Sequence, residues 1–474
     1  MIQKILGGSV RFFIKAILIF SLVAFLVCIF VFTRSYPEMF SIRELVWFPV
    51  GAGVCCGLYF LWKWLVKKSS AFTIVFLSTL SMVVYAIVLL TFNTVPVSDY
   101  GMIWKTANEM AAGTFNAHEL KGSDYIIAYD YLIGISSFES MLIRTFGPNF
   151  WVLKVVTCLC LLLVSYLVYK MARTKTTEES ARAAYILSAL FLPYIMTAGQ
   201  FSNHHIGTIF LLLSLYYIDR KSMKDAALAG FFISVLNFFR PIAPIVLLAT
   251  VCLCVYKMIA DGEIAHELRQ LAIIVITYLA TTAVYDTLFV TVDYAIDPVS
   301  TSNVPYFKFH KGMSNYDEPW TMLNKFDGDL KAYNEWEKAE VRKIVTSPST
   351  PVFVLNKMCR YLGLFDAQFE HTYNHDETVW QHYPIKAFYS IGWMQYIIYV
   401  CLALIGYIWW AKRNSIDIYQ IWFIGNTLVY LFIEAITHYR FEHYIFLFLM
   451  AGCAFPLVRD RIARRRSGIV SNTA

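Results

Sequence analysis

Long apolar runs are the feature that most constrains this chain. A helix needs roughly 17 to 25 apolar residues to cross the hydrocarbon core of a bilayer. Backbone N–H and C=O groups in that core must be paired within their own segment, so such runs fold as helices. The sequence therefore predicts an all-α polytopic membrane protein with about twelve spans, near 14–33, 45–65, 71–93, 150–170, 181–199, 205–219, 224–239, 242–257, 271–291, 387–410, 415–433 and 441–458.

The composition agrees with this class and excludes a soluble globular domain. Charged residues make up 15% of the chain and hydrophobic residues 58%, whereas soluble domains carry about 25% charged residues. The net charge of +7 does not indicate nucleic acid, because the basic residues gather in short loops between apolar runs. Nine of the ten cysteines lie in apolar runs and only Cys359 lies in a polar stretch, so neither a disulfide framework nor a cysteine metal motif is expected.

The basic loops also predict an orientation. Cytoplasmic loops of membrane proteins carry an excess of Lys and Arg. The loops that carry this excess here contain Lys63, Lys67, Lys68, Lys170, Arg173, Lys175, Arg220, Lys221, Lys224, Lys412 and Arg413, and the tail contains "RDRIARRR". We therefore expect both termini in the cytoplasm and an uncleaved first helix that anchors the chain. The polar segments 94–149, 292–386 and 434–442 then lie outside.

The spans and loops divide the chain into five parts. Two additional helices occupy 1–70, and a core of spans follows in 71–291 with its first outer loop at 94–149. A second large outer loop, 292–386, precedes the last three spans in 387–458, and a basic cytoplasmic tail forms 459–474.

The first outer loop opens with a carboxylate, Asp99, followed by a short amphipathic helix. Tyr100, Ile103, Ala107 and Met110 recur at helical spacing and form one apolar face. A second stretch of this kind occupies 129–147, and both are typical of helices that lie in the membrane interface. Asp99 has two compatible interpretations: an N-cap for the helix, or a general base that deprotonates a hydroxyl acceptor.

This arrangement resembles the GT-C glycosyltransferase superfamily. The residues that carry the resemblance are the acid at the start of the first outer loop, the two interfacial helices and the segment "FGPNFWVLKVV…LPYIMTAGQFSN". The nearest branch is similar to the protein mannosyltransferases and aminoarabinose transferases, which take a sugar from a polyprenyl-phosphate carrier. The resemblance implies that Asp99 is the catalytic base. It differs in two places: Tyr100 stands where a second acid is found in protein mannosyltransferases, and "DYIIAYDYLIG" lacks their proline-rich turn.

Two outer corners between spans carry further candidates. Arg240 precedes Pro241, which turns the chain, and it either anchors a helix end or binds a lipid phosphate; the Arg-Pro turn also resembles the family. His204 and His205 either bind a sugar or phosphate or are ordinary interface histidines. Adjacent histidines point about 100° apart on a helix, so they do not form a chelating pair.

The segment "EAITHYRFEHY" (434–444) places several ionisable residues beside an apolar run. Such residues are costly at membrane depth unless they are paired or functional. Glu434 and His438 are one turn apart and can pair with each other. The segment also resembles the family's last outer loop, so we expect Arg440 to bind phosphate and Glu434 and Tyr100 to contact substrate.

The loop 292–386 offers weaker candidates. In "KFHKGMSNYDEPW" the side chains of Asp317, Glu318 and Trp320 can bind a sugar or simply form a cap. Lys357 is a further phosphate candidate. The segment 370–380 is rich in His and acids but fits no metal motif.

The sequence therefore predicts a lipid-linked glycosyltransferase with an inverting mechanism. We expect it in a bacterial plasma membrane, with the site on the extracytoplasmic face and a glycan, lipid or protein as acceptor. No cofactor is required, because the leaving group is already a phosphate; a divalent cation is left open. Two rivals remain: a Wzy-type polysaccharide polymerase, and a flippase or transporter, against which the absence of an internal repeat argues.

Overall fold

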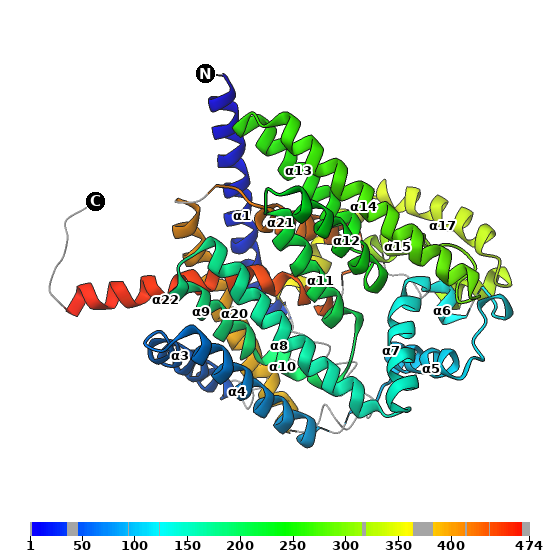
Figure 1. Cartoon of the computed structure of the whole chain (residues 1–474), viewed down its shortest axis with the longest axis horizontal. Coiled ribbons are helices and arrows are strands. Elements are labelled where there is room, and N and C mark those ends of the chain that lie inside the picture. Colours follow the sequence, from blue (N-terminus) through cyan, green and yellow to red (C-terminus); the bar gives the residue numbers. More distant parts are fainter. Residues whose placement is uncertain are drawn as a thin grey trace.

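The computed structural model describes residues 2–35, 46–92, 94–122, 124–314, 319–363, 383–412, 415–435 and 437–466. Within these ranges the chain is helical and contains no strand (Figure 1). The longer helices are α1 (Ile2–Ser35), α3 (Trp47–Leu65), α4 (Ser70–Thr91), α8 (Phe150–Lys175), α13 (Ala243–Asp261), α14 (Ile264–Thr291), α20 (Tyr383–Ala411) and α22 (His443–Arg466).

The remaining helices are shorter. Those near the apolar spans are α9 (Glu178–Ala189), α10 (Leu192–Met196), α11 (Asn203–Ile218), α12 (Met223–Phe239) and α21 (Ile418–Phe432). Those in the two large polar segments are α5 (Ser98–Ala112), α6 (Tyr125–Ala128), α7 (Ile133–Phe146), α15 (Phe307–Met313), α16 (Pro319–Leu323), α17 (Leu330–Val345) and α18 (Thr350–Gly363). Five 3₁₀ turns connect them: Ala117–Glu119, Asp130–Leu132, Thr197–Gly199, Asn324–Phe326 and Thr437–Phe441.

The prediction of a polytopic membrane protein is confirmed. Nine helical segments in the described part of the chain are long and apolar enough to cross a bilayer. Large apolar side chains stand exposed on these segments, for example Phe20 at 73% and Leu90 at 79%, as lipid contact requires. The other three predicted spans fall on α11, α12 and α21, which have only 16, 17 and 15 residues. The structure thus supports nine spans directly, against the twelve expected.

Local sequence explains where several of these helices begin and end. Ser69 accepts a hydrogen bond from the Phe72 amide at the start of α4, and Asn149 does the same for Trp151 at the start of α8. Both are residues that favour the N-cap, where the first backbone N–H groups lack partners. Gly113 closes α5 with a φ of +74°, a left-handed conformation that glycine adopts without steric cost.

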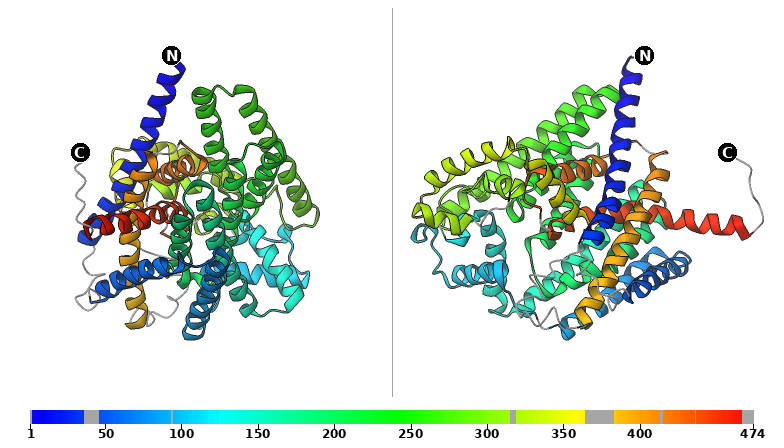
Figure 2. Two further views of the ribbon diagram at one scale, coloured as in Figure 1. Left: turned by 60° about the vertical axis from the view of Figure 1, so that its left-hand side comes forward. Right: turned by 180° about the vertical axis from the view of Figure 1, so that it is seen from behind.

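Helix α9 and the N-terminal part of α22 lie at the centre of the molecule, and the C-terminal part of α22 projects outward (Figure 1). α22 packs against α20 and α9, and α9 also packs against α8. Of the most apolar window in each span, 89% is buried for Glu178–Gly199 and 83% for Tyr439–Ala463. Figure 2 shows α1 and α13 projecting from this centre toward the end where the N-terminus lies.

The two helices predicted for the segment 94–149 are present. The stretch around 100–111 is α5, and the stretch 129–147 contains the 3₁₀ turn Asp130–Leu132 followed by α7. α5 packs against α7, and both lie outside the nine candidate spans. Figure 1 shows them at one end of the molecule, where α15 and α17 also lie. The second polar segment is therefore folded into helices around the same end.

The close crossing of α20 and α22 gives a stability prediction. A Cβ on Gly406 would lie 1.9 Å from the Met450 carbonyl oxygen, so Gly406→Ala must push the two helices apart. We expect it to lower the free energy of unfolding by about 1–3 kcal/mol, the usual cost of overpacking. The measurement is SDS-titrated unfolding in mixed micelles.

Gly425→Ala in α21 is the matched control. A Cβ there meets no atom within 4 Å, and alanine favours helix. Equal stability of the two variants would contradict the observed crossing.

Candidate functional site

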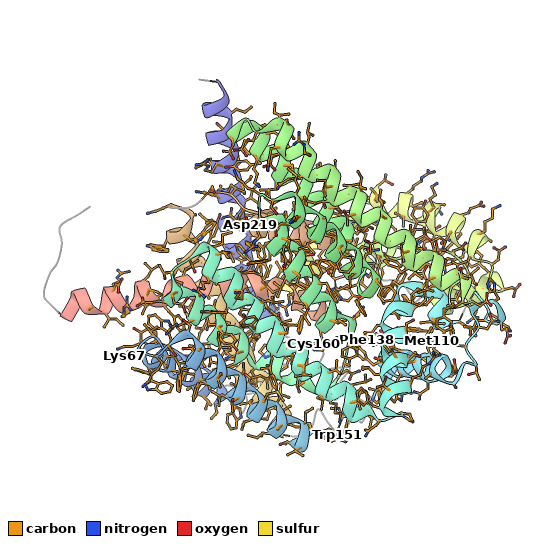
Figure 3. All side chains as sticks on the ribbon, in the orientation of Figure 1. Lys67, Met110, Phe138, Trp151, Cys160 and Asp219 are labelled. Carbon is orange, nitrogen blue, oxygen red and sulfur yellow. The ribbon has the colours of Figure 1, made fainter. Side chains whose placement is uncertain are left out.

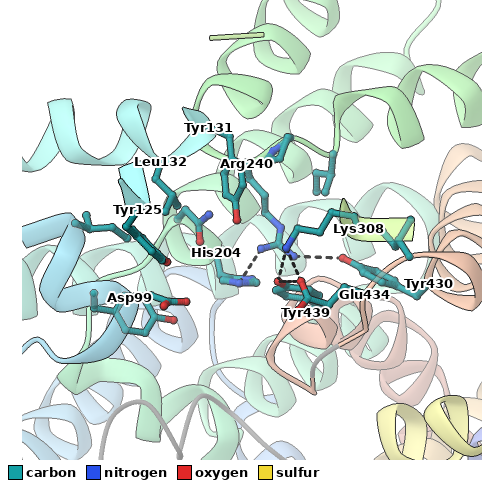
Figure 4. A pocket seen from close by; sticks show the side chains of 16 residues that line it. Asp99, Tyr125, Tyr131, Leu132, His204, Arg240, Lys308, Tyr430, Glu434 and Tyr439 are labelled. Carbon is teal, nitrogen blue, oxygen red and sulfur yellow. Dashed lines mark hydrogen bonds and ion pairs between the residues drawn. The ribbon is translucent and has the colours of Figure 1, made fainter. Parts of the chain in front are cut away.

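A single cavity collects most of the polar residues that the sequence singled out. It has a volume of about 140 Å³ and lies between the start of α5, the region of α6, the start of α11, the end of α12, α15 and the end of α21 (Figure 4). Its ionisable and aromatic lining residues are Asp99, Tyr100, Tyr125, Tyr131, His204, Arg240, Lys308, Tyr430, Glu434 and Tyr439. Five of the eight predicted site residues are among them: Asp99, Tyr100, His204, Arg240 and Glu434.

The three short apolar helices all end at this cavity. α11 begins beside it at Asn203, α12 ends at Arg240, and α21 ends just before Ile433. Helices of 15 to 17 residues rise only about 22–26 Å, less than the hydrocarbon thickness of about 30 Å. Backbone ends at membrane depth are tolerated where they line a polar cavity. The polar cavity therefore explains why all three helices can be this short, because their backbone ends line it.

Arg240 is the buried cation at the end of α12. It is the C-cap, in extended conformation with φ −150° and ψ 120°, as the following proline requires. Its Nε lies 2.8 Å from Glu442 Oε1, and its guanidinium also contacts His204 Nε2 at 2.7 Å and the Tyr430 hydroxyl at 3.3 Å. Gly207 leaves space for it, because a Cβ there would be 3.2 Å from Arg240 Cβ. The ion pair with Glu442 thus fixes the orientation of the Arg240 side chain.

Lys308 is the second cation on the wall, and it comes from the start of α15. Its ammonium binds the Glu434 carboxylate and the Tyr439 hydroxyl, the latter at 3.2 Å. Lys311, one turn later, lies 3.1 Å from the other oxygen of Glu434. The Glu434 amide in turn donates to the Lys308 carbonyl at 2.7 Å. These contacts attach the second polar segment to the end of α21.

Burial and charge act in opposite directions on Glu434. Burial alone would raise the pKa of this carboxyl group, but Lys308 and Lys311 outweigh it and hold the pKa at about 2. The same pairing raises the pKa of Lys308 well above its usual value, although burial acts to lower it. The pair is therefore fully ionised at neutral pH.

Asp99 lies in the first turn of α5, and the N-cap interpretation is wrong. The cap position is Val97, and no side chain caps the helix. Ser98, directly before Asp99, has a φ of +52°, a left-handed conformation that is costly for a residue other than glycine. The Asp99 side chain therefore does not cap the helix, and Asp99 lines the cavity.

Asp99 and Tyr125 separate the cavity from a second hollow. This outer hollow has a volume of about 660 Å³ and is also lined by Asp124, Thr321 and Asn324. Burial, and then the negative charge of Asp99, raise the pKa of the Tyr125 hydroxyl. In Figure 4, Asp99 and Tyr125 are on one side, Arg240, Lys308 and Glu434 on the other, and His204 in between. Asp99 can therefore contact one molecule in the cavity and another in the outer hollow.

Three predicted site residues do not line the cavity, which corrects their expected positions. His205 is buried in a capping box with Ser202 and contacts the Thr197 hydroxyl at 2.9 Å. Arg440 is buried among tyrosines, and it donates to the Leu362 carbonyl and the Tyr396 hydroxyl. Lys357 donates to the carbonyls of Gly312, Leu431 and Ile433. These contacts join segments of the chain outside the cavity.

Other predicted features fall outside what the structure describes. Asp317, Glu318 and the segment 370–380 are not among the described residues, and neither are the side chains of Trp320 and His438. The expected Glu434–His438 pair is therefore not assessed. The described partners of the Glu434 carboxylate are Lys308, Lys311 and the Tyr439 hydroxyl, which donates to it at 3.0 Å.

Sequence reasoning missed Lys308, Tyr125, Tyr131 and Tyr439. Lys308 stands in "FKFHKG", where Lys311 is three residues away, and nothing in the pattern separates the two. Only the fold directs Lys308 into the cavity. The tyrosines are equally ordinary in a chain that contains 31 of them.

Comparison with models of known protein families gives no match, and comparison with curated proteins gives none either. The site must therefore be interpreted from its own geometry.

The Glu434 pair gives a prediction with a defined pH dependence. Glu434→Gln is expected to lower the free energy of unfolding by about 1.5–3 kcal/mol at pH 7, because hydrogen bonds to charged groups contribute that much. A carboxyl group whose pKa is depressed in the folded state stabilises it above the unfolded pKa of about 4.3. That contribution is lost as the pH falls toward the folded pKa of about 2. The stability difference between wild type and variant should be constant from neutral pH to about pH 5 and shrink below that.

Glu340→Gln is the control for this experiment. Glu340 pairs with Lys343, whose side chain is 71% exposed, so its loss should cost below about 1 kcal/mol at any pH. If Glu434→Gln had a cost as small as this control, Glu434 would not be held by the two lysines.

Proposed function

We propose that this chain is an integral-membrane glycosyltransferase that takes a sugar from a polyprenyl-phosphate carrier and transfers it to a hydroxyl acceptor. The observation that carries the proposal is that Asp99, Arg240 and Lys308 line the same cavity. The acid faces the two cations across it (Figure 4). A sugar phosphate needs cations for its phosphate, and an acceptor hydroxyl needs a base. Both requirements are matched by residues from segments far apart in the chain.

The phosphate would bind between Arg240 and Lys308. The planar guanidinium offers several N–H donors in a fork that suits phosphate oxygens, and Lys308 adds a compact positive charge. Each cation keeps a carboxylate behind it, Glu442 for Arg240 and Glu434 for Lys308. These carboxylates position the cations and lower the affinity for anions in general, so the donor must also be recognised through its sugar and its lipid.

Tyrosines on the same wall suit a sugar. Tyr125, Tyr131, Tyr430 and Tyr439 surround the cavity and offer both flat apolar faces and hydroxyl groups, the two features that recognise carbohydrate. His204 stacks on Tyr439 with ring centroids 5.7 Å apart, which fixes one side of this wall.

Asp99 would act as the general base at the junction of the two hollows. In the proposed step an acceptor hydroxyl in the outer hollow attacks the anomeric carbon, and its proton passes to Asp99. The new oxygen–carbon bond forms as the bond from carbon to phosphate oxygen breaks, and that electron pair stays on the phosphate. Attack from the face opposite the phosphate inverts the anomeric configuration. The leaving group is stable as an anion, so the step requires no metal.

The position of the cavity supports an extracytoplasmic site with both termini in the cytoplasm. α12 begins next to Lys221 and Lys224 and ends at the cavity, and α8 runs from Phe150 to Lys175. The basic residues thus gather at one end of the helices and the cavity lies at the other, the asymmetry that the positive-inside rule requires. The expected twelve spans fit the same orientation, with the three short helices ending at the cavity.

The first test replaces the proposed base. Asp99→Asn keeps the shape of the side chain and removes its basicity, so release of free polyprenyl phosphate should fall by at least about 100-fold. The assay uses purified protein in lipid with a panel of polyprenyl-phosphate monosaccharides and measures binding of each donor in parallel. The control is Glu109→Gln, an exposed acid on the same helix that pairs with Lys105 and should leave turnover unchanged.

Wild-type turnover in Asp99→Asn would refute the assignment of the base. Turnover only with oligosaccharide carriers would identify a polymerase, and lipid movement without turnover would identify a flippase.

The second test separates the two lysines that share Glu434. Lys308→Met and Lys311→Met each remove one partner of Glu434, but only Lys308 lines the cavity. Lys308→Met should weaken donor binding by about 10- to 100-fold, the value of a lost charged hydrogen bond. Lys308→Met and Lys311→Met should lower the free energy of unfolding by similar amounts. Lys311→Met should change donor affinity much less than Lys308→Met. Parallel losses of donor binding in both variants would mean that Lys308 acts only through Glu434.

A further inference from the structure

A second group of polar residues lies at the other end of α12, far from the cavity. Glu263, His266 and Glu267 stand at the start of α14, and their ligand atoms all lie within 4.8 Å of one another. Glu263 is the N-cap residue of α14, and His266 and Glu267 lie in the first turn that follows. The 17 residues of α12, which rise about 25 Å, separate this end from Arg240. In Figure 1 the turn between α13 and α14 lies close to the N-terminal end of α1, away from α5 and α7, and Figure 3 shows the side chains around it.

The ring of His266 is oriented by the neighbouring turn. Its Nε2 lies 3.2 Å from the Lys221 carbonyl oxygen. A carbonyl can only accept, so Nε2 carries the hydrogen and Nδ1 of the neutral ring presents a lone pair. Nδ1 lies 3.7 Å from Glu267 Oε1. Two acceptor atoms are therefore close together.

Neither of these acceptors receives a hydrogen bond. Glu267 is only 1% exposed, and both its Oε1 and the Nδ1 of His266 are buried without a hydrogen-bond partner. The Lys257 ammonium forms an ion pair with Oε1 at 3.7 Å, a separation beyond hydrogen-bond length. Buried acceptors without donors are costly, and a cation placed between them removes that cost.

We propose that Glu263, His266 and Glu267 bind one divalent transition-metal ion of the zinc type. One imidazole nitrogen, two carboxylates and a water molecule form a tetrahedral set that suits Zn²⁺. The hydrogen bond from His266 to the Lys221 carbonyl has the role that outer partners of metal-binding histidines usually have, since it fixes the ring. The bound ion would join the turn before α12 to the start of α14. This inference does not depend on the proposed transferase activity.

Lys221 pairs with one of the proposed ligands and would compete with the metal, so its removal gives a test with a predicted sign. Lys221 lies 3.2 Å from Glu263, and both side chains are largely exposed, at 66% and 44%; such pairs are weak. A metal can displace Lys221, but it must do so against the charge of the lysine. Removing that charge should tighten binding, whereas an arrangement that only stabilises the start of a helix gives no such change.

The experiment measures Zn²⁺ binding to the purified full chain in detergent, after removal of metal, by equilibrium dialysis against ZnCl₂. Wild type should bind one Zn²⁺ per chain, His266→Gln should bind it at least about tenfold more weakly, and Lys221→Met should bind it more tightly. The control is His118→Gln, which removes a histidine beside another carboxylate, 3.7 Å from Asp293, and should leave binding unchanged. Lys221 and His118 are exposed at 66% and 51%, and His266 is partly exposed at 33%, so the result does not depend on replacing the buried Glu267.

Equal affinity in wild type and His266→Gln would overturn the proposal, as would the absence of saturable binding in wild type. A loss in His266→Gln together with a gain in Lys221→Met is the result that only a metal site produces.

Discussion

The buried charges at the end of α12 and α21 are the interaction on which the architecture of the site depends. Arg240 is fixed by Glu442, and Lys308 is fixed by Glu434. A lone charge at this depth would be strongly unfavourable, so each pair forces its two segments together. Glu442 is 202 residues from Arg240 in sequence and Glu434 is 126 from Lys308. Two ion pairs thus join α12, α15 and the segment between α21 and α22.

The cavity follows from this arrangement and from the lengths of the helices. α11, α12 and α21 are too short to carry apolar surface across a whole bilayer, and their ends leave a polar space that the paired cations and the tyrosines line. The loops close this space: α5 brings Asp99 and α15 brings Lys308. The spans therefore supply the fixed part of the site, and the two large polar segments supply the residues proposed to carry charge and protons.

Several site residues were predictable because their local context is informative. Asp99 stands out as the acid that opens a polar segment, and Arg240 as the cation before a proline at the end of an apolar run. Both line the cavity. Arg440 stood in a comparable local pattern and Lys357 in a weaker one, yet their donors bind backbone carbonyls and a tyrosine instead. A local sequence pattern indicates that a buried cation needs a partner. It does not indicate which residue that partner is.

The sequence by itself determined the class of the protein: a helical membrane chain with two helices in its first large polar segment. This follows because backbone hydrogen bonding in lipid is satisfied within each segment, so an apolar run specifies its own helix. Only the tertiary structure decided that Lys308 rather than Arg440 joins Arg240 in the cavity, and that Glu434 pairs with two lysines of the second polar segment. Those outcomes depend on ion pairs between residues far apart in sequence, whose energies exist only after the helices have packed.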